Sequence, residues 1–285
     1  MATASLTTSV SSPGKRGQTV LSSVILAAIG VLFLVPLLWI VFASVDGEAT
    51  VTMKIPETWT LDNFTQVMTW ELTWQPLLNS ILVSVGTAVI TVVVGVLAAY
   101  PLSRYAMRFQ KSFMYAILFG TGLPITAMMV PVYALFVSFG LLDSVWGVIV
   151  FMAATSLPMA IWMLKNFMDS VPISLEEAAW VDGAGSMQAL ARIVIPLMRP
   201  GIGVVFIFVF TTAWGNFFVP FVLLFTSSKF PAAVSIFNFF GQYGSIAYGQ
   251  LAAYSVIYAT PMVLLYVLVQ KFSGGAFALA GSVKG

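Results

Sequence analysis

The sequence predicts an all-α membrane protein with six transmembrane helices, and two observations predict this class. Hydrophobic residues make up 60% of the 285 residues and charged residues only 8%, with a mean hydropathy of +0.99. A soluble domain of this length cannot bury so much apolar surface in its core. The second observation is a series of long apolar stretches, each of which is expected to be helical because lipid offers the backbone no hydrogen-bond partners.

Six stretches are long and apolar enough to cross about 30 Å of hydrocarbon. They lie at residues 20–44, 77–99, 112–139, 144–167, 200–226 and 251–272. The first exceeds the roughly 7–15 residues of a signal-peptide core, so it is expected to stay as an anchor. Residues 1–19 are rich in serine, threonine, alanine and glycine and are expected to be a disordered tail before a transmembrane domain of residues 20–285.

Basic residues are unevenly distributed between the two ends of the expected spans. Only Lys54 and Lys229 lie on the side opposite the N-terminus. The side of the N-terminus holds Lys15, Arg16, Arg104, Arg108, Lys111, Lys165, Arg192, Arg199, Lys271 and Lys284. By the positive-inside rule, both termini and residues 172–196 are expected in the cytoplasm. The distribution gives no reason to expect a nucleic acid as a partner.

The residue types present exclude several kinds of chemistry. The chain has no cysteine and no histidine, which removes thiol catalysis and the commonest zinc ligands. Its carboxylates are scattered, so neither a metal site nor a catalytic site is expected, and the one Gly-Lys pair, in SPGKRGQT, lacks the spacing of a phosphate-binding loop. Because charged residues cluster at the ends of the spans, proton-driven transport within the chain is disfavoured. Energy is expected to come from elsewhere.

One cytoplasmic connection gathers charge and small residues in this otherwise lipid-like chain. The stretch EEAAWVDGAGS, residues 176–186, holds three carboxylates. Ser174, followed three residues later by Glu177, forms a capping box, which predicts a short helix that starts at Leu175. That helix is expected to end at Gly183, because glycine adopts the left-handed conformation after a helix most readily.

A second short helix is expected to follow, capped by Ser186 and ending at Pro196. Because both helices are too short and polar to cross the bilayer, residues 172–196 are expected to project into the cytosol as a helix-turn-helix. Its small residues let another protein approach closely: Ala178, Ala179, Gly183, Ala184 and Gly185. A plainer interpretation makes Glu177 only a cap and Gly183 only a helix stop.

The run EAA-x3-G-x9-I-x-x-P in this connection resembles the signature loop of ABC-importer membrane subunits, the binding-protein-dependent permeases. It comprises Glu177, Ala178, Ala179, Gly183, Ile193 and Pro196, with Ile195 where the familiar ending has leucine. Further stretches extend the resemblance over residues 20–285 and point to carbohydrate permeases of the maltose type. They are TWTLDNF, AAYPLSRYAM, PVYALFVSFGLLDSVWG, AWGNFF, FGQYG and GSVKG.

The resemblance implies the type I ABC-importer permease fold, in which residues 172–196 form a coupling helix that docks into a separate ATPase subunit. The residues expected to serve this coupling are Glu177, Ala178, Ala179, Asp182, Gly183, Ile193 and Pro196. The implied partners are a second homologous permease subunit, two ATPase subunits, an extracytoplasmic solute-binding protein and a sugar. The implied location is the cytoplasmic membrane of a bacterium or archaeon. ATP and magnesium are expected in the ATPase subunits, and no cofactor is expected in this chain.

Candidate residues for a substrate pathway come from AWGNFF and from the start of the second span. Sugars are bound by aromatic faces and by amides, so Trp214 and Asn216 are candidates, Asn216 being the better one. On a regular helix these residues lie about 200° apart, so both flank a pore only if Gly215 distorts the turn. Asn79 is a third candidate. In the alternative interpretation Trp214 packs between helices, Asn216 bonds across a helix interface, and Asn79 caps or cross-links helices.

The sequence therefore favours a permease subunit that moves a sugar into the cytoplasm with ATP hydrolysed by partner subunits. Within the same family, a permease for a glycerol phosphate or a polyol is the alternative. From other classes, a passive channel or an intramembrane enzyme stays open. A channel has no need of a docking loop, and an enzyme needs a catalytic set that the sequence lacks.

Overall fold

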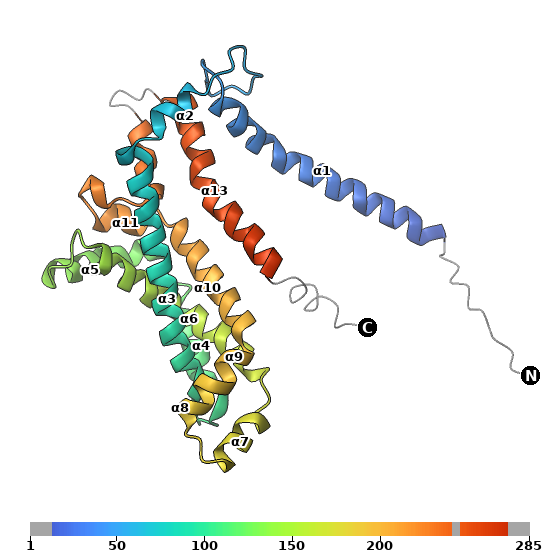
Figure 1. Cartoon of the computed structure of the whole chain (residues 1–285), viewed down its shortest axis with the longest axis vertical. Coiled ribbons are helices and arrows are strands. Elements are labelled where there is room, and N and C mark those ends of the chain that lie inside the picture. Colours follow the sequence, from blue (N-terminus) through green and yellow to red (C-terminus); the bar gives the residue numbers. More distant parts are fainter. Residues whose placement is uncertain (1–12, 241–245, 273–285) are drawn as a thin grey trace, which may run out of the picture. The chain divides into compact units, whose positions relative to one another are not determined.

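The computed structural model describes residues 13–240 and 246–272, and within these ranges every regular element is helical (Figure 1). Asp46 and Trp59 form an isolated antiparallel bridge. The chain forms two compact units, Met1–Gln66 with Ile246–Val256, and Val67–Ser245 with Ile257–Gly285. The stretch GSVKG, part of FGQYG and residues 1–12 of the expected tail lie outside the described residues.

The first unit contains α1 (Pro13–Ser44), α2 (Asp62–Val67) except its last residue, and the first residues of α13 (Tyr248–Phe272). Residues 13–19, expected in the tail, are helical. Proline starts the helix readily because its fixed φ suits the first turn. At the other end of α1, the Asn63 amide nitrogen donates to the carbonyls of Ser44 at 3.2 Å and Asp46 at 2.9 Å, which satisfies acceptors that a helix end leaves unpaired.

The second unit is built on three helices that lie side by side, α3 (Gln75–Arg104), α6 (Val145–Asp169) and α10 (Arg199–Trp214) (Figure 1). Small residues let these helices approach closely. Gly95 of α3 faces the side chain of Leu164 on α6, and Gly201 of α10 faces the ring of Phe167. The other elements of this unit are η1 (Trp70–Trp74), α4 (Gln110–Gly120), α5 (Ile125–Ser138), α7 (Ser174–Val181), α8 (Ser186–Ala189), η2 (Leu190–Val194), α9 (Ile195–Leu197), α11 (Phe218–Leu223), η3 (Ser227–Lys229), α12 (Ala232–Ser235) and η4 (Ile236–Phe239).

Four segments of the described chain are single helices long and apolar enough to cross a membrane: Val20–Ser44, Trp70–Arg104, Val145–Asp169 and Tyr248–Leu268. Two bent pairs raise the number to six if each pair counts as one span. The expected span 112–139 is bent by 90° between α4 and α5, and α8 to α9 meets α10 at 79°. The expected span 200–226 is also interrupted, because α10 ends at Trp214 and α11 begins at Phe218.

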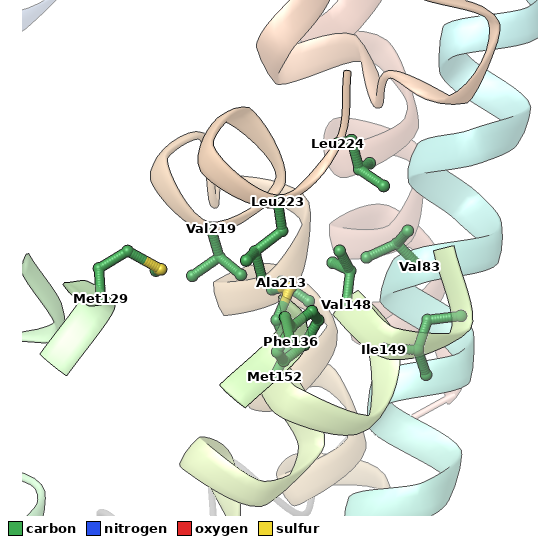
Figure 2. Close-up of a cluster of buried hydrophobic side chains, with 10 residues drawn as sticks. All are labelled: Val83, Met129, Phe136, Val148, Ile149, Met152, Ala213, Val219, Leu223 and Leu224. Atoms are coloured by element: carbon green, nitrogen blue, oxygen red, sulfur yellow. The ribbon is translucent and has the colours of Figure 1, made fainter. Parts of the chain in front are cut away.

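A cluster of buried apolar side chains joins α5 and α11 to the three-helix core (Figure 2). The cluster includes side chains from both sides of the bend between α10 and α11. Their burial stabilises this interruption of the span, which the hydropathy pattern did not reveal. Its members are Val83, Met129, Phe136, Val148, Ile149, Met152, Ala213, Val219, Leu223 and Leu224.

Candidate functional site

Residues 172–197 form a helix-turn-helix at one end of α3 and α6 (Figure 1). The first helix, α7, ends at Val181 and is followed by Gly183, which has a φ of +87°. Its backbone N–H donates to the Trp180 carbonyl at 3.0 Å, and that of Ala184 donates to the Ala179 carbonyl at 2.9 Å. These bonds satisfy the last carbonyls of α7 and turn the chain toward α8. Gly183 thus adopts the left-handed conformation that the sequence predicted.

The predicted side-chain caps of both helices are wrong. Ser174 is already inside α7 and makes no capping bond, because Ile173 is the residue before the first helical turn. The Ile173 carbonyl accepts hydrogen bonds from the backbone N–H groups of Glu176 and Glu177. For the second helix the cap position belongs to Gly185, whose N–H donates to the Gln188 side chain at 3.1 Å. Each helix therefore begins one residue earlier than the capping patterns predicted.

The helical path also continues past Pro196 to Leu197. The turn before it, η2, is π-helical, and the Ile195 N–H donates to the Leu190 carbonyl. A proline in an α-helix lacks an N–H and clashes with the carbonyl four residues earlier. The wider π turn relieves this conflict, so the predicted stop at Pro196 is wrong.

The helix-turn-helix exposes apolar side chains. Val181 is 88% exposed and Met187 is 63% exposed. Of the predicted coupling residues, Glu177, Ala178, Asp182 and Gly183 are also exposed, whereas Ala179, Ile193 and Pro196 are half-buried. A loop that faces water normally carries charged or polar side chains at its exposed positions. Exposed apolar side chains of this size mark contact surfaces for other proteins.

Sequence reasoning missed the residue that anchors this helix-turn-helix. Glu176 is fully buried, and its carboxylate accepts a hydrogen bond from the Tyr100 hydroxyl at 2.8 Å and pairs with Arg104 Nε at 2.5 Å. The Arg104 side chain is only 4% exposed. Tyr100 and Arg104 lie in the last turns of α3, so this cluster joins α3 to α7. The only sequence signal was an excess of charge near the ends of both segments, and no spacing rule connects residues so far apart in the chain.

A cavity of about 580 Å³ opens between the bend of α4 and α5, α6, and α10. Its lining carries hydroxyl groups and one amide but no charged side chain. The hydroxyls of Thr155 and Ser156 donate to the Met152 carbonyl, so their oxygens keep lone pairs for further acceptance. The lining residues are Ile117, Gly120, Thr121, Leu123, Ile125, Met128, Met152, Thr155, Ser156, Pro158, Met159, Phe208, Thr212 and Asn216.

Of the three predicted pathway residues, the structure places only Asn216 at this cavity. The side chain also caps α11, because its carbonyl oxygen accepts the Val219 N–H at 3.0 Å. The cap occupies the oxygen and leaves the amide nitrogen without a hydrogen-bond acceptor among the described residues. Asn216 is therefore both a cap of α11 and a hydrogen-bond donor at the cavity.

Trp214 and Asn79 lie elsewhere. Trp214 is 3% exposed and its ring stacks between those of Phe210 at 5.8 Å and Tyr258 at 5.5 Å. The Tyr258 hydroxyl donates to the Trp214 carbonyl at 2.8 Å, which pairs an acceptor at the end of α10. The Asn79 amide donates to the carbonyls of Ser228 at 2.8 Å and Phe230 at 3.1 Å. Asn79 thus ties the start of α3 to η3.

Asp143 forms a second tie at that end of the second unit. Its carboxylate accepts the backbone N–H groups of Phe225 and Thr226, the Thr226 hydroxyl at 2.6 Å, and Lys229 Nζ at 2.6 Å. The hydrogen bond from Lys229, followed by those from Thr226 and the backbone, holds the pKa of the Asp143 carboxyl well below its usual range. Asp143 has a φ of +57°, a conformation that aspartate and asparagine tolerate.

Replacing Asp143 with asparagine is expected to lower the melting temperature of the purified protein. Asparagine suits the same backbone conformation and keeps one acceptor, so the substitution removes mainly the charge that Lys229 contacts. Because the native pKa is lowered, the stabilisation is present above the ordinary carboxyl pKa of about 4 and is lost as the pH falls toward the native value. The difference in melting temperature between wild type and D143N should therefore be constant from pH 7 to about pH 5 and narrow below about pH 4.

A control for this prediction is Glu57→Gln. Glu57 is an exposed carboxylate for which no hydrogen bond or ion pair is found among the described residues, and its replacement should leave the melting temperature unchanged at every pH. Equal melting temperatures for D143N and wild type at pH 7 would show that the Asp143 contacts do not stabilise the fold.

Among the described residues no group of three or more histidine, cysteine, aspartate or glutamate side chains is placed to hold a metal ion. The features that the structure brings together are therefore a projecting helix-turn-helix, its buried anchor to α3, and an uncharged cavity beside a broken span.

Comparison with known proteins relates this arrangement to transport. The family model described as "Binding-protein-dependent transport system inner membrane component" matches residues 91–274. The chain is 33% identical over 256 residues to the trehalose transport system permease protein of Mycobacterium tuberculosis, across 88% of this chain and 93% of that protein. It is 28% identical over 265 residues to the diacetylchitobiose uptake system permease protein of Streptomyces coelicolor, across 92% and 88% of the two chains.

The fold has a match among solved structures. A chain in the crystal structure of a bacterial ABC transporter involved in the import of the acidic polysaccharide alginate superposes with a TM-score of 0.80. The two are 24% identical, and the match covers 93% of this chain and 99% of that chain. The family match spans more than half of the sequence. The chain therefore belongs to the family of inner membrane components of binding-protein-dependent transport systems.

Proposed function

We propose that this protein is the permease subunit of an ABC importer that passes a sugar into the cytoplasm. The observation that carries the proposal is the helix-turn-helix of α7 and α8, which exposes Val181 and Met187 beyond the ends of the spans. Such a surface suits a docking partner that pushes on the membrane domain. The family and the relatives named for trehalose and diacetylchitobiose support a sugar as the cargo.

The proposed energy source is ATP hydrolysed by two partner ATPase subunits, which also hold the nucleotide and its magnesium ion. This chain lacks the sequence of a phosphate-binding loop. A second homologous permease subunit completes the pathway, and an extracytoplasmic solute-binding protein delivers the sugar. The family description, which names dependence on a binding protein, supports the last of these partners.

The proposed orientation places both termini and residues 172–196 in the cytoplasm. Arg104 and Lys165 lie at the end of α3 and α6 that carries the helix-turn-helix, whereas Asn79 lies at the other end of α3. Basic residues favour the cytoplasmic side of a membrane. The Asp143 and Lys229 cluster is then extracytoplasmic.

The cavity supports an uncharged, hydroxyl-rich cargo. Its hydroxyl oxygens accept hydrogen bonds and the Asn216 amide donates one, which suits sugar hydroxyls because these both donate and accept. Among the described residues no charged side chain lines the cavity, so these residues provide no cation to pair with a glycerol phosphate. A neutral polyol satisfies the same groups and is the second candidate.

Uptake by the complete complex in lipid vesicles tests this function. Trehalose, a maltodextrin and diacetylchitobiose serve as probes, with the purified binding protein on one side and ATP on the other. We expect at least one of these sugars to accumulate only when ATP is hydrolysed. Sugar flux that is the same without ATP would instead establish a passive channel.

Variants of Asn216 separate its two contacts. N216S keeps a good N-cap oxygen for α11 and replaces the amide donor with a shorter hydroxyl, whereas N216A removes both the cap and the donor, at a cost of about 0.5–2 kcal/mol for the lost cap. We expect N216S to assemble normally and to lower the rate of sugar uptake, with N216A lowering both uptake and the yield of complex. Wild-type uptake by N216S, with only N216A impaired, would show that uptake does not need the amide nitrogen of Asn216.

A further inference from the structure

Two sequence stretches that lie far apart in the chain meet at one buried polar cluster. AAYPLSRYAM contributes Tyr100 and Arg104 from the end of α3, and EEAAWVDGAGS contributes Glu176 from the first turn of α7. The exposed Glu177 that follows belongs to the docking surface, the exposed residues of α7 and α8 that include Val181 and Met187. The Glu176 carboxylate is fully buried inside the protein. It therefore has a different role from the carboxylate of Glu177.

The hydrogen bonds of this cluster hold α7 in one orientation relative to α3. Arg104 uses Nε to contact Glu176 at 2.5 Å and Nη2 to donate to the Val171 carbonyl at 3.1 Å. One guanidinium thus holds both the first turn of α7 and the chain that leads into it. The Tyr100 hydroxyl donates to the other Glu176 oxygen at 2.8 Å, so the carboxylate is held from two consecutive turns of α3. Bonds of this charge-assisted kind are short, strong and dependent on geometry.

Neighbouring polar contacts extend the link to α6. Arg104 Nη1 donates to the Ser103 hydroxyl at 3.2 Å, and that hydroxyl donates to Asp169 at 2.6 Å. Asp169 in turn pairs with Lys165 at 2.5 Å. In a chain with 8% charged residues, burying an ion pair is costly, and a well-packed apolar contact would stabilise the fold as well or better. Stability alone therefore does not account for the choice of side chains.

We propose that Glu176, Arg104 and Tyr100 are positioning residues that make α7 and α3 move as one body when the docking surface is displaced. The inference rests on the proposed function, in which partner ATPases push on α7. Apolar side chains can slide past one another, whereas a buried carboxylate held by a guanidinium and a hydroxyl has one favourable arrangement. Displacement of α7 is thereby passed to α3, which lies beside α6 and α10 in the core of the transmembrane unit.

The distance between α7 and α3 in the working complex tests this inference without knowledge of the sugar. The chain has no cysteine, so spin labels can be placed at Leu175→Cys on α7 and at Val93→Cys on α3, which are both exposed positions. The distance distribution is measured in the whole complex with no nucleotide and after trapping with ATP and vanadate. In the wild-type background we expect the same narrow distribution in both states.

Two variants weaken the link in different ways. R104K keeps the charge but loses the forked contact to Glu176 and Val171, and Y100F removes one hydrogen bond without leaving an unpaired charge. We expect the distribution to shift or broaden on trapping in both variants, although the ATPase subunits stay bound. R108K is the matched control, because Arg108 lies at the same end of the unit and has no ion pair among the described residues.

The outcomes separate this inference from the proposed function. A merely structural role of the cluster lowers the yield of complex but leaves the distance unchanged in the complexes that assemble, so wild-type distributions in R104K and Y100F would overturn the inference. A wild-type distribution that itself shifts on trapping would overturn it as well. Complexes that bind no ATPase even with the wild-type chain would instead refute the proposed function.

Discussion

Replacing Gly183 with valine should abolish ATP-driven uptake while leaving the protein inserted in the membrane. Gly183 has a φ of +87°, and a side chain in the left-handed region costs roughly 1–2 kcal/mol. Apart from the two chain neighbours, no atom of the described residues lies within 4 Å of the position that a new Cβ would occupy, so the penalty is conformational and not steric. The chain is expected to relieve it by changing the angle between α7 and α8, which displaces the docking surface.

Gly185 provides the matched control for this prediction. It lies two residues away, has a φ of −76°, and is equally free of neighbours within 4 Å. G185V adds the same bulk to this surface without the backbone penalty, so it should retain more uptake than G183V. G183N should also retain more uptake than G183V because asparagine tolerates the left-handed region. Equal uptake by G183V and G185V would mean that the turn geometry at Gly183 does not matter for transport.

Replacing Gly201 with leucine should prevent the second unit from packing. A Cβ at this position lies 2.5 Å from the Phe167 ring carbon Cγ, so even alanine forces the ring to move. Overpacking a tight contact costs typically about 1–3 kcal/mol, and a leucine adds three more carbons to the clash. We expect a large loss of folded protein in detergent, measured by size-exclusion chromatography, because α6 and α10 can no longer approach each other.

Gly203 is the control, since it lies on the same helix with no atom within 4 Å of its Cβ position. G203L should therefore give a yield close to that of wild type. Adding Phe167→Ala to G201L should recover part of the folded protein by vacating the space that the leucine needs. Full yield from G201L alone would contradict the packing of α6 against α10.

The apolar character of the spans and the left-handed turn at Gly183 were predictable because each depends on local chemistry. Hydropathy reports whether a segment suits lipid, and only glycine adopts positive φ freely. The bends between α4 and α5 and between α10 and α11 were not predictable in the same way. The sequence holds residues that favour a bend there, Gly122 and Pro124 in one segment and Gly215 in the other, but membrane helices tolerate such residues. Whether the helix breaks depends on packing among side chains from distant parts of the sequence.

The features of the candidate site likewise fall into those that local sequence predicts and those that depend on distant residues. The run EAA-x3-G-x9-I-x-x-P located the helix-turn-helix. The predicted caps lie one residue after the observed ones, because Ile173 and Gly185 already occupy the cap positions of the two helices. Glu176 and Arg104 form their contact across 72 residues, and no local pattern encodes such a pairing. The amide of Asn216 was identified by its chemistry, whereas its capping contact depends on the end of α10 at Trp214.

Cross-linking from Val181 tests most directly the central claim, that the helix-turn-helix of α7 and α8 docks on an ATPase subunit. The chain has no cysteine, so Val181→Cys can carry a photoactivatable maleimide as its single attachment point in this subunit, and the side chain is 88% exposed. In the purified complex we expect one adduct, which joins this chain to the ATPase. As a control, an excess of soluble α7–α8 peptide should give no adduct with an unrelated protein. Adducts only with lipid or with the extracytoplasmic binding protein would contradict the claim.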